Sequence, residues 1–166
     1  MSLDMRDKAA VQKRLWDDID ASRFGMLGAE GAAIHLTPMT AFAERESGKI
    51  WFFTSKDSEL AKASESGVPA SFVVMTKDQD LQACIRGELV ATNDALHIEK
   101  YWNSVIAAWF PMGKEDPTLT MLCLSCEAAD VWISDKGPVG FGWEIAKANM
   151  TGSRPDVGGH AAVVLA

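Results

Sequence analysis

The sequence predicts a mainly β protein, an antiparallel barrel with flanking helices. Six or seven short apolar segments are separated by polar or glycine-containing turns of hairpin length. Only one short helical segment lies between the third and fourth of these, which excludes a parallel doubly wound sheet. The 166 residues, 48% of them hydrophobic, suit a substantial core. We expect a single domain over residues 1–150, including an amino-terminal helix, and a tail over 151–166.

Composition restricts the classes of function. The net charge of −7 argues against a nucleic-acid surface, which needs clustered basic residues. No apolar run reaches the roughly 18 to 20 residues that span a bilayer, and the amino terminus has no apolar signal-peptide core. The cysteines, Cys84, Cys123 and Cys126, are an odd set that suits free thiols. We therefore expect a cytoplasmic protein that does not act at a membrane.

The first 49 residues predict a helix and a hairpin. Apolar residues recur at helical spacing over residues 4–20, with charged residues on the other side. Alternating apolar residues then predict a strand over 22–27 and, after a glycine-containing turn at 28–31, a second strand over 33–40. A polar turn over 44–49 leads into the next strand.

Residues 50–58 are the segment on which the functional prediction depends. Four bulky residues predict a buried strand, and hydroxyls and a lysine then lead into a short helix that contains Leu60. A strand that enters a helix through polar residues leaves free backbone N–H groups, which suit an anion. A simpler role stays open, because Asp57 or Ser58 would also cap the first helical turn.

The remaining chain predicts further strands and two helices. Gly87 interrupts the clearest alternating strand and indicates a bulge or tight curl. In order, we expect strands over 68–75 and 81–89 joined by a charged loop, a helical region from Asn93 or Asp94 to Pro111, strands over 119–124 and 131–133, a turn over 137–142, a helix over 143–148 and a loose tail from Thr151.

The residues that could bind a metal do not form a recognisable site. Cys123 and Cys126 have the spacing of a zinc or redox pair, but residues three apart on a strand point to opposite faces, so packing is the expected role. His35, His97 and His160 have no ligand-spaced partner. No phosphate-binding glycine loop, dinucleotide fingerprint or nucleophile elbow is present. We therefore expect no metal, and these motifs assign no catalytic residue.

Several segments, in this order along nearly the whole chain, carry a family resemblance. They are His35–Thr40, Trp51–Ser58, Arg86–Glu88, Ala108–Pro111 with Asp116–Pro117, Ala129–Trp132 and Thr151–Asp156. Together they resemble the general stress protein branch of the pyridoxamine 5'-phosphate oxidase-like split barrels, which bind flavin mononucleotide (FMN).

The resemblance implies a six-stranded antiparallel Greek-key split barrel that forms a homodimer with two FMN sites at the subunit interface. It also implies the residues of each site. The ring would be edged by Thr37, Pro38 and Met39, the ribityl phosphate would be reached by Phe53, Thr54, Ser55, Lys56 and Ser58, and Trp109 and Trp132 would approach from the partner subunit. FAD in place of FMN, or no flavin, stays open.

The chain departs from the family pattern at two positions. Many relatives have an arginine where Thr37 stands and a lysine where Leu60 stands, and both cations bind the phosphate. At about 1.5 to 3 kcal/mol for each charge-assisted bond, their loss would weaken binding by roughly two to four powers of ten. Lys56 is the best placed residue to compensate.

Three functions remain on this evidence. The first is a flavin-binding general stress protein, an oxidoreductase of unknown substrate. The second is a flavin-free dimeric binding or sensor protein on the same fold, supported by Thr37 and Leu60. The third is a true pyridoxamine 5'-phosphate oxidase, for which the tail offers only Arg154 and His160.

Overall fold

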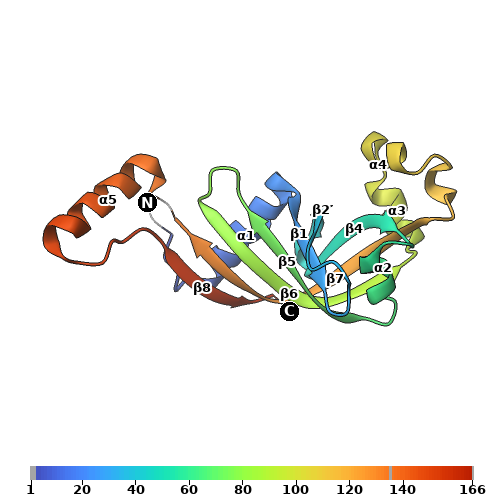
Figure 1. Cartoon of the computed structure of the whole chain (residues 1–166), viewed down its shortest axis with the longest axis horizontal. Helices are drawn as coiled ribbons and strands as arrows, with labels where there is room; N and C mark the ends of the chain where they lie inside the picture. Colours follow the sequence, from blue (N-terminus) through green and yellow to red (C-terminus); the bar gives the residue numbers. More distant parts are fainter. Residues whose placement is uncertain (1–2, 135, 166) are drawn as a thin grey trace.

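An antiparallel sheet of eight strands curls around the helix α1 (Lys8–Ser22), and the other helices lie toward its two ends (Figure 1). The computed structural model describes residues 3–134 and 136–165. In chain order the elements are α1 (Lys8–Ser22), β1 (Phe24–Ala29), β2 (Thr37–Thr40), β3 (Phe42–Glu44), β4 (Lys49–Ser55), α2 (Glu59–Ala63), β5 (Val68–Met75), β6 (Leu81–Thr92), α3 (Ala95–Tyr101), α4 (Ser104–Trp109), β7 (Leu119–Ile133), α5 (Gly137–Thr151) and β8 (Gly159–Val164), with 3-10 turns at Arg45–Ser47 and Gly113–Glu115.

The strand order is β2-β1-β5-β6-β7-β4-β3, and β8 pairs with the same edge of β7 as β4 but farther along the strand, at residues 128–133 instead of 119–125. The strands β2 and β3 stand at the two ends of this order, although only Ala41 separates them in sequence. The sheet must therefore curl until its two edges approach each other, and β2 lies against β4. The prediction of a mainly β split barrel with flanking helices is confirmed, with eight strands instead of six.

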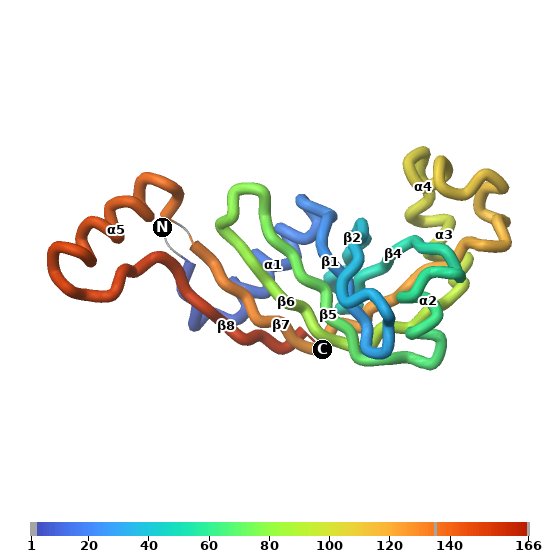
Figure 2. Tube along the Cα trace, viewed as in Figure 1, coloured from blue at the N-terminus to red at the C-terminus, as the bar shows by residue number. Residues whose placement is uncertain are grey.

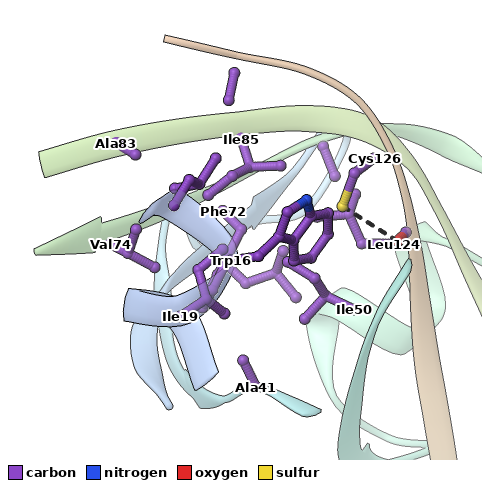
Figure 3. Close-up of a cluster of buried hydrophobic side chains, with 14 of the residues drawn as sticks. Trp16, Ile19, Ala41, Ile50, Phe72, Val74, Ala83, Ile85, Leu124 and Cys126 are labelled. Atoms are coloured by element: carbon purple, nitrogen blue, oxygen red, sulfur yellow. Dashed lines mark hydrogen bonds between the residues drawn. The ribbon is translucent and has the colours of Figure 1, made fainter. Parts of the chain in front are cut away.

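The main core lies between α1 and the inner face of the sheet. The expected amphipathic helix is present, and its side chains Leu15, Trp16 and Ile19 are buried. Figure 3 shows Trp16 and Ile19 beside Phe72 of β5 and Ile85 of β6. Because strand side chains alternate, every second residue of β5 and β6 faces this core.

A second core lies on the other face of β4, under α3 and α4. Trp51 belongs to it, together with Ile106 and Phe110 from the α4 region, whereas Phe52 belongs to the main core. A strand buried on both faces reads as a continuous apolar run, which explains the four bulky residues at the start of the 50–58 segment.

The two closely spaced cysteines fall in different cores, as predicted. Cys123 packs in the second core and Cys126 in the main core, where its thiol lies 3.7 Å from the Leu124 carbonyl oxygen (Figure 3). Burial raises the pKa of Cys126 to about 12. Such a thiol stays protonated and has a packing role.

The prediction of a bulge at Gly87 and the prediction of a helix cap at Asn93 or Asp94 are both confirmed. The register of β6 against β7 shifts between Arg86 and Gly87, and a side chain at position 87 would meet the Ser125 carbonyl oxygen at 1.9 Å. Asp94, rather than Asn93, caps α3 by accepting a hydrogen bond from the His97 amide at 3.0 Å.

The carboxyl-terminal half differs from the prediction in its strands. The segments expected as two strands over 119–124 and 131–133 are one strand, β7, of 15 residues. Its polar centre was left outside both predicted strands, but Ser125 pairs with Lys49 of β4 and Asp130 pairs with Ala162 of β8, so the ladder continues. The short strand β3 was also not expected.

The helices of this half differ as well. The helical region before Pro111 is broken into α3 and α4, because Asn103 caps α4 by accepting from the Val105 and Ile106 amides at 2.9 and 3.1 Å. The glycines at 137–142, expected as a turn, are the first turns of α5. The expected loose tail contains β8, which pairs with residues 128–133 of β7. No helix in the described ranges is long and apolar enough to cross a membrane.

Candidate functional site

The corner between β4 and α2 is organised by Ser58. Its hydroxyl oxygen accepts hydrogen bonds from the Ala61 amide and from the Thr54 hydroxyl, both at 3.1 Å. Ser58 is therefore the helix cap, and Asp57 is not. Because the Ser58 oxygen accepts both bonds, its own proton is free to be donated outward.

The backbone donors of this corner are largely used within the protein. The amide of Lys56 donates to the Thr118 carbonyl at 2.8 Å, that of Asp57 to the Ser55 hydroxyl at 3.3 Å, and that of Ser58 to the Ser55 carbonyl at 3.0 Å. The expectation of several free N–H groups is therefore wrong for these three residues. The side-chain donors for an anion are the exposed Lys56 ammonium and the hydroxyls of Ser55 and Ser58.

The predicted ring-edge residues lie on β2, which pairs with β1. Thr37 stands opposite Leu27, and Pro38 stands opposite Met26. Met39 is half-buried against the main core. Because β2 lies against β4, the structure brings the predicted ring-edge strand beside the predicted phosphate strand.

The predicted residues of β4 divide between its two faces. Thr54 alternates with Phe53 and so lies on the face of the main core. Phe53 lies on the other face, where its ring centroid is 5.7 Å from that of Phe42 and 6.2 Å from that of Trp102. Within one protomer a flat ring cannot contact both faces of this strand.

The two predicted tryptophans lie outside this corner: Trp132 is distant from it along β7, and Trp109 is exposed to solvent. Trp132 pairs with Gln82 and stacks on His160 with ring centroids 4.8 Å apart. It lies eleven residues along β7 from Met121, the partner of Phe53, which is about 36 Å of extended strand. Trp109 ends α4 and is 79% exposed. Only another molecule could bring Trp132 to a protomer's β4 corner.

Leu60 occupies one of the two positions at which the resemblance predicts a cation. Its side chain is 2% exposed and belongs to the main core. The nearest cation of the helix, Lys62, pairs with Glu59 at 3.7 Å. A cation at position 60 would point into apolar packing in this protein, not to a phosphate at the surface.

A half-buried carboxylate, which the sequence did not reveal, joins β3 to α3. Glu44 Oε1 accepts from Lys100 Nζ at 2.6 Å and from the Tyr101 hydroxyl at 2.7 Å, and Oε2 accepts from Trp51 Nε1 at 3.3 Å. Burial acts to raise the pKa of Glu44, but the bonds from Lys100 and Tyr101 outweigh it and lower the pKa to about 2. Glu44 is therefore ionised at neutral pH, and its hydrogen bonds connect β3 to α3 and β4 at the border of the second core.

His97 completes this cluster. Its ring stacks on Trp51 with centroids 3.7 Å apart and planes 17° apart. Its Nε2 lies 3.3 Å from Glu44 Oε1, and its Nδ1 lies 3.1 Å from Asp94 Oδ1. The sequence signal was the spacing of His97 and Tyr101 on one helix face, but Glu44 had been assigned to a polar turn.

Beside this cluster is a cavity of about 290 Å³. Phe42 and Trp102 form part of its wall, and Phe53 lies behind both rings. Its lining residues are Asp20, Arg23, Phe42, Ala43, Lys100, Tyr101, Trp102 and Asn103. None of the predicted flavin residues lines it. Among the residues described, no three His, Cys, Asp or Glu side chains could hold a metal ion together.

Comparison with known proteins places this geometry in context. Residues 10–156 match the family described as pyridoxamine 5'-phosphate oxidase like. A general stress protein 26 from Jannaschia sp. CCS1 is 34% identical over 94% of this chain and 99% of that protein, with a TM-score of 0.79. No curated protein matches the chain.

Two proteins from Xanthomonas are also similar in structure. A general stress family protein from Xanthomonas campestris pv. campestris is 37% identical over 76% of this chain and 89% of that protein, with a TM-score of 0.71. The general stress FMN/FAD binding protein from Xanthomonas citri is 37% identical over 75% and 89%, with a TM-score of 0.70.

Proposed function

The chain belongs to the pyridoxamine 5'-phosphate oxidase-like family, and from that membership we propose that it is a homodimeric general stress protein that binds a flavin and acts as an oxidoreductase. The similar protein from Xanthomonas citri is described as FMN/FAD binding, which supports the cofactor class. The substrate is left open. FMN is the preferred flavin because the β4 corner offers donors for one terminal phosphate.

The observation that carries the proposal is the donor set of that corner. Lys56 is an exposed cation, and the hydroxyl protons of Ser55 and Ser58 are free, because both oxygens act as acceptors in the bonds that shape the turn. Three such donors suit a phosphate dianion. The carboxylate of Asp57 is exposed at the same turn and opposes this binding.

The flavin, when bound, supplies hydride and one-electron redox chemistry. The residues of this chain would hold and orient it. Lys56, Ser55 and Ser58 would bind the phosphate, and the β2 strand with Pro38 and Met39 would edge the ring. No general acid or base is assigned.

The homodimer is part of the proposal because the site is incomplete in one protomer. The outer face of the sheet exposes apolar side chains, among them Phe24 and Met26 of β1 and Val73 and Met75 of β5. Two of them, Met26 and Val73, are direct cross-strand neighbours. Such a patch is typical of a protein interface. A two-fold partner covering it would also explain how Trp109 and Trp132 reach a distant flavin.

A flavin titration tests the proposal. The purified protein should absorb at about 450 nm, or bind FMN or FAD with a shift in that band. Thr37→Arg should raise FMN affinity by roughly 10- to 100-fold, since it adds a charge-assisted bond at the surface of β2. A protein that binds neither flavin at about millimolar concentration, with or without Thr37→Arg, is not a flavoprotein.

A flavin-free dimeric binding or sensor protein on the same fold is the second candidate. It is favoured by the burial of Leu60 and by the internal use of the corner amides. A crystal of the protein soaked in FMN would distinguish the flavoprotein from the sensor, since side chains that close the β4 corner would favour the sensor.

A true pyridoxamine 5'-phosphate oxidase has less support, because His160 of the tail already contacts Asp130 at 3.1 Å. Turnover of pyridoxamine 5'-phosphate would establish it.

The three cysteines are free thiols. This supports the proposal of a reducing, cytoplasmic location.

A further inference from the structure

The helix α5 projects from the end of the sheet, and none of its residues is buried (Figures 1 and 2). Four residues at helical spacing, Val139, Trp143, Ala146 and Met150, form one exposed apolar stripe. Trp143 is 68% exposed and Met150 is 87% exposed. A helix of about 15 residues is marginal in water by itself, so this stripe needs a partner surface.

A second unpartnered stripe lies on α4. Val105 and Trp109, four residues apart, are 70% and 79% exposed, and Met112 in the following turn is similarly exposed. The two stripes cannot cover each other within one chain, because α4 and α5 lie at opposite ends of the long axis (Figures 1 and 2). Neither stripe contains a charged residue.

We propose that α5 is a dimerisation arm whose Val139–Trp143–Met150 stripe packs on the Val105–Trp109–Met112 stripe of a second copy of this chain. A two-fold axis perpendicular to the long axis of the molecule would place the α5 of each chain at the α4 of its partner. The same symmetry operation would therefore cover the α4 stripe and the α5 stripe of both chains. The inference rests on the dimer of the proposed function and adds a second contact to it, apart from the outer-face patch of β1 and β5. It does not depend on the flavin.

The exposed area agrees with this occupant. With about 150 to 250 Å² for each of the two tryptophans and roughly 60 to 120 Å² for each of the four Val and Met side chains, the two stripes offer on the order of 500 to 1,000 Å² per chain. Standard interfaces bury roughly 800 Å² per partner. An anionic membrane is a poor occupant, because α5 carries one lysine and the chain has a net charge of −7.

Cysteine cross-linking tests the contact directly. In a Cys84→Ser background, chains with Trp143→Cys and chains with Val105→Cys are co-expressed as full-length protein and oxidised. The contact between unlike stripes predicts a covalent dimer from the mixture and little from either variant alone. Efficient cross-linking of Trp143→Cys with itself would mean that α5 pairs with α5, and the proposal would be wrong.

Sedimentation separates this inference from the wider proposal. Trp143→Ser should raise the dimer dissociation constant by at least about 30-fold, as for an interface hot spot, while Val164→Ser, an equally exposed control on β8, should leave it unchanged. A dimer unaffected by Trp143→Ser overturns the arm and leaves the flavin dimer intact. A wild type that is monomeric at all concentrations overturns both the arm and the dimer, and the flavin titration stays an independent test.

Discussion

The Tyr101 hydroxyl donates a 2.7 Å hydrogen bond to the Glu44 carboxylate, which fastens α3 to the edge strand β3. The same carboxylate oxygen accepts from Lys100, and the other accepts from Trp51. Without this charge, three donors at the border of the second core would lose their shared acceptor. The cluster is therefore the polar link between the barrel and the helices that cover it.

Glu44→Gln should lower the free energy of unfolding by about 2 kcal/mol, since a neutral amide replaces the charge that several donors share. Urea denaturation followed by tryptophan fluorescence would measure the change. The matched control is Glu46→Gln, an exposed residue of the following 3-10 turn, which should change stability by less than about 0.5 kcal/mol. Equal effects of the two variants would show that the cluster does not stabilise the fold.

The same carboxylate predicts a dependence of stability on acid pH. The folded pKa of Glu44 is about 2, below the value of about 4.3 for an unfolded glutamate. Its contribution is therefore fully present above about pH 4.3 and is lost as the pH falls toward 2. The difference in unfolding free energy between wild type and Glu44→Gln should shrink over this window. A difference that stays constant from about pH 6 to pH 2 would contradict the assignment.

Gly87→Ala should destabilise the protein by about 3 kcal/mol, because the new methyl group would lie 1.9 Å from the Ser125 carbonyl oxygen, and two paired strands would have to separate. Gly142→Ala is the control, since no atom lies within 4 Å of its added methyl group. As an alanine in a helix, it should stabilise α5 by up to about 1 kcal/mol. Thermal unfolding of both variants measures the contrast.

Leu60→Lys should destabilise by about 3 kcal/mol or more and should not strengthen flavin binding, because the ammonium would be buried in the main core without a partner. Leu60→Met conserves volume and should cost less than about 1.5 kcal/mol. A Leu60→Lys protein of unchanged stability that binds FMN more tightly would show that position 60 can reach the phosphate.

Lys56→Met should weaken FMN binding by roughly 10- to 100-fold, since Lys56 is the exposed cation of the β4 corner. The control is Lys62→Met, which removes a cation that already pairs with Glu59. Titration of FMN by flavin fluorescence would measure both. Equal affinities of wild type and Lys56→Met would move the phosphate away from this corner.

Local pattern alone determined much of this protein. The alternation over 81–89 predicted β6, the helical spacing in the first 20 residues predicted α1, and Gly87 predicted the bulge. The divergence of Cys123 and Cys126 also followed from the two-residue period of a strand. These features depend on neighbours in sequence, which a single chain displays directly.

Tertiary structure decided the features that depend on distant residues. The centre of β7 was not predicted as a strand and is one, because β4, β6 and β8 supply its hydrogen-bond partners. Glu44 looked like part of a polar loop and is a shared acceptor, because α3 folds back over β3. Leu60 stands at a position where the family resemblance predicts a cation, but its side chain belongs to the main core. Residue type is local, but partner, face and burial are set by the closing of the sheet, which brings segments more than fifty residues apart into contact.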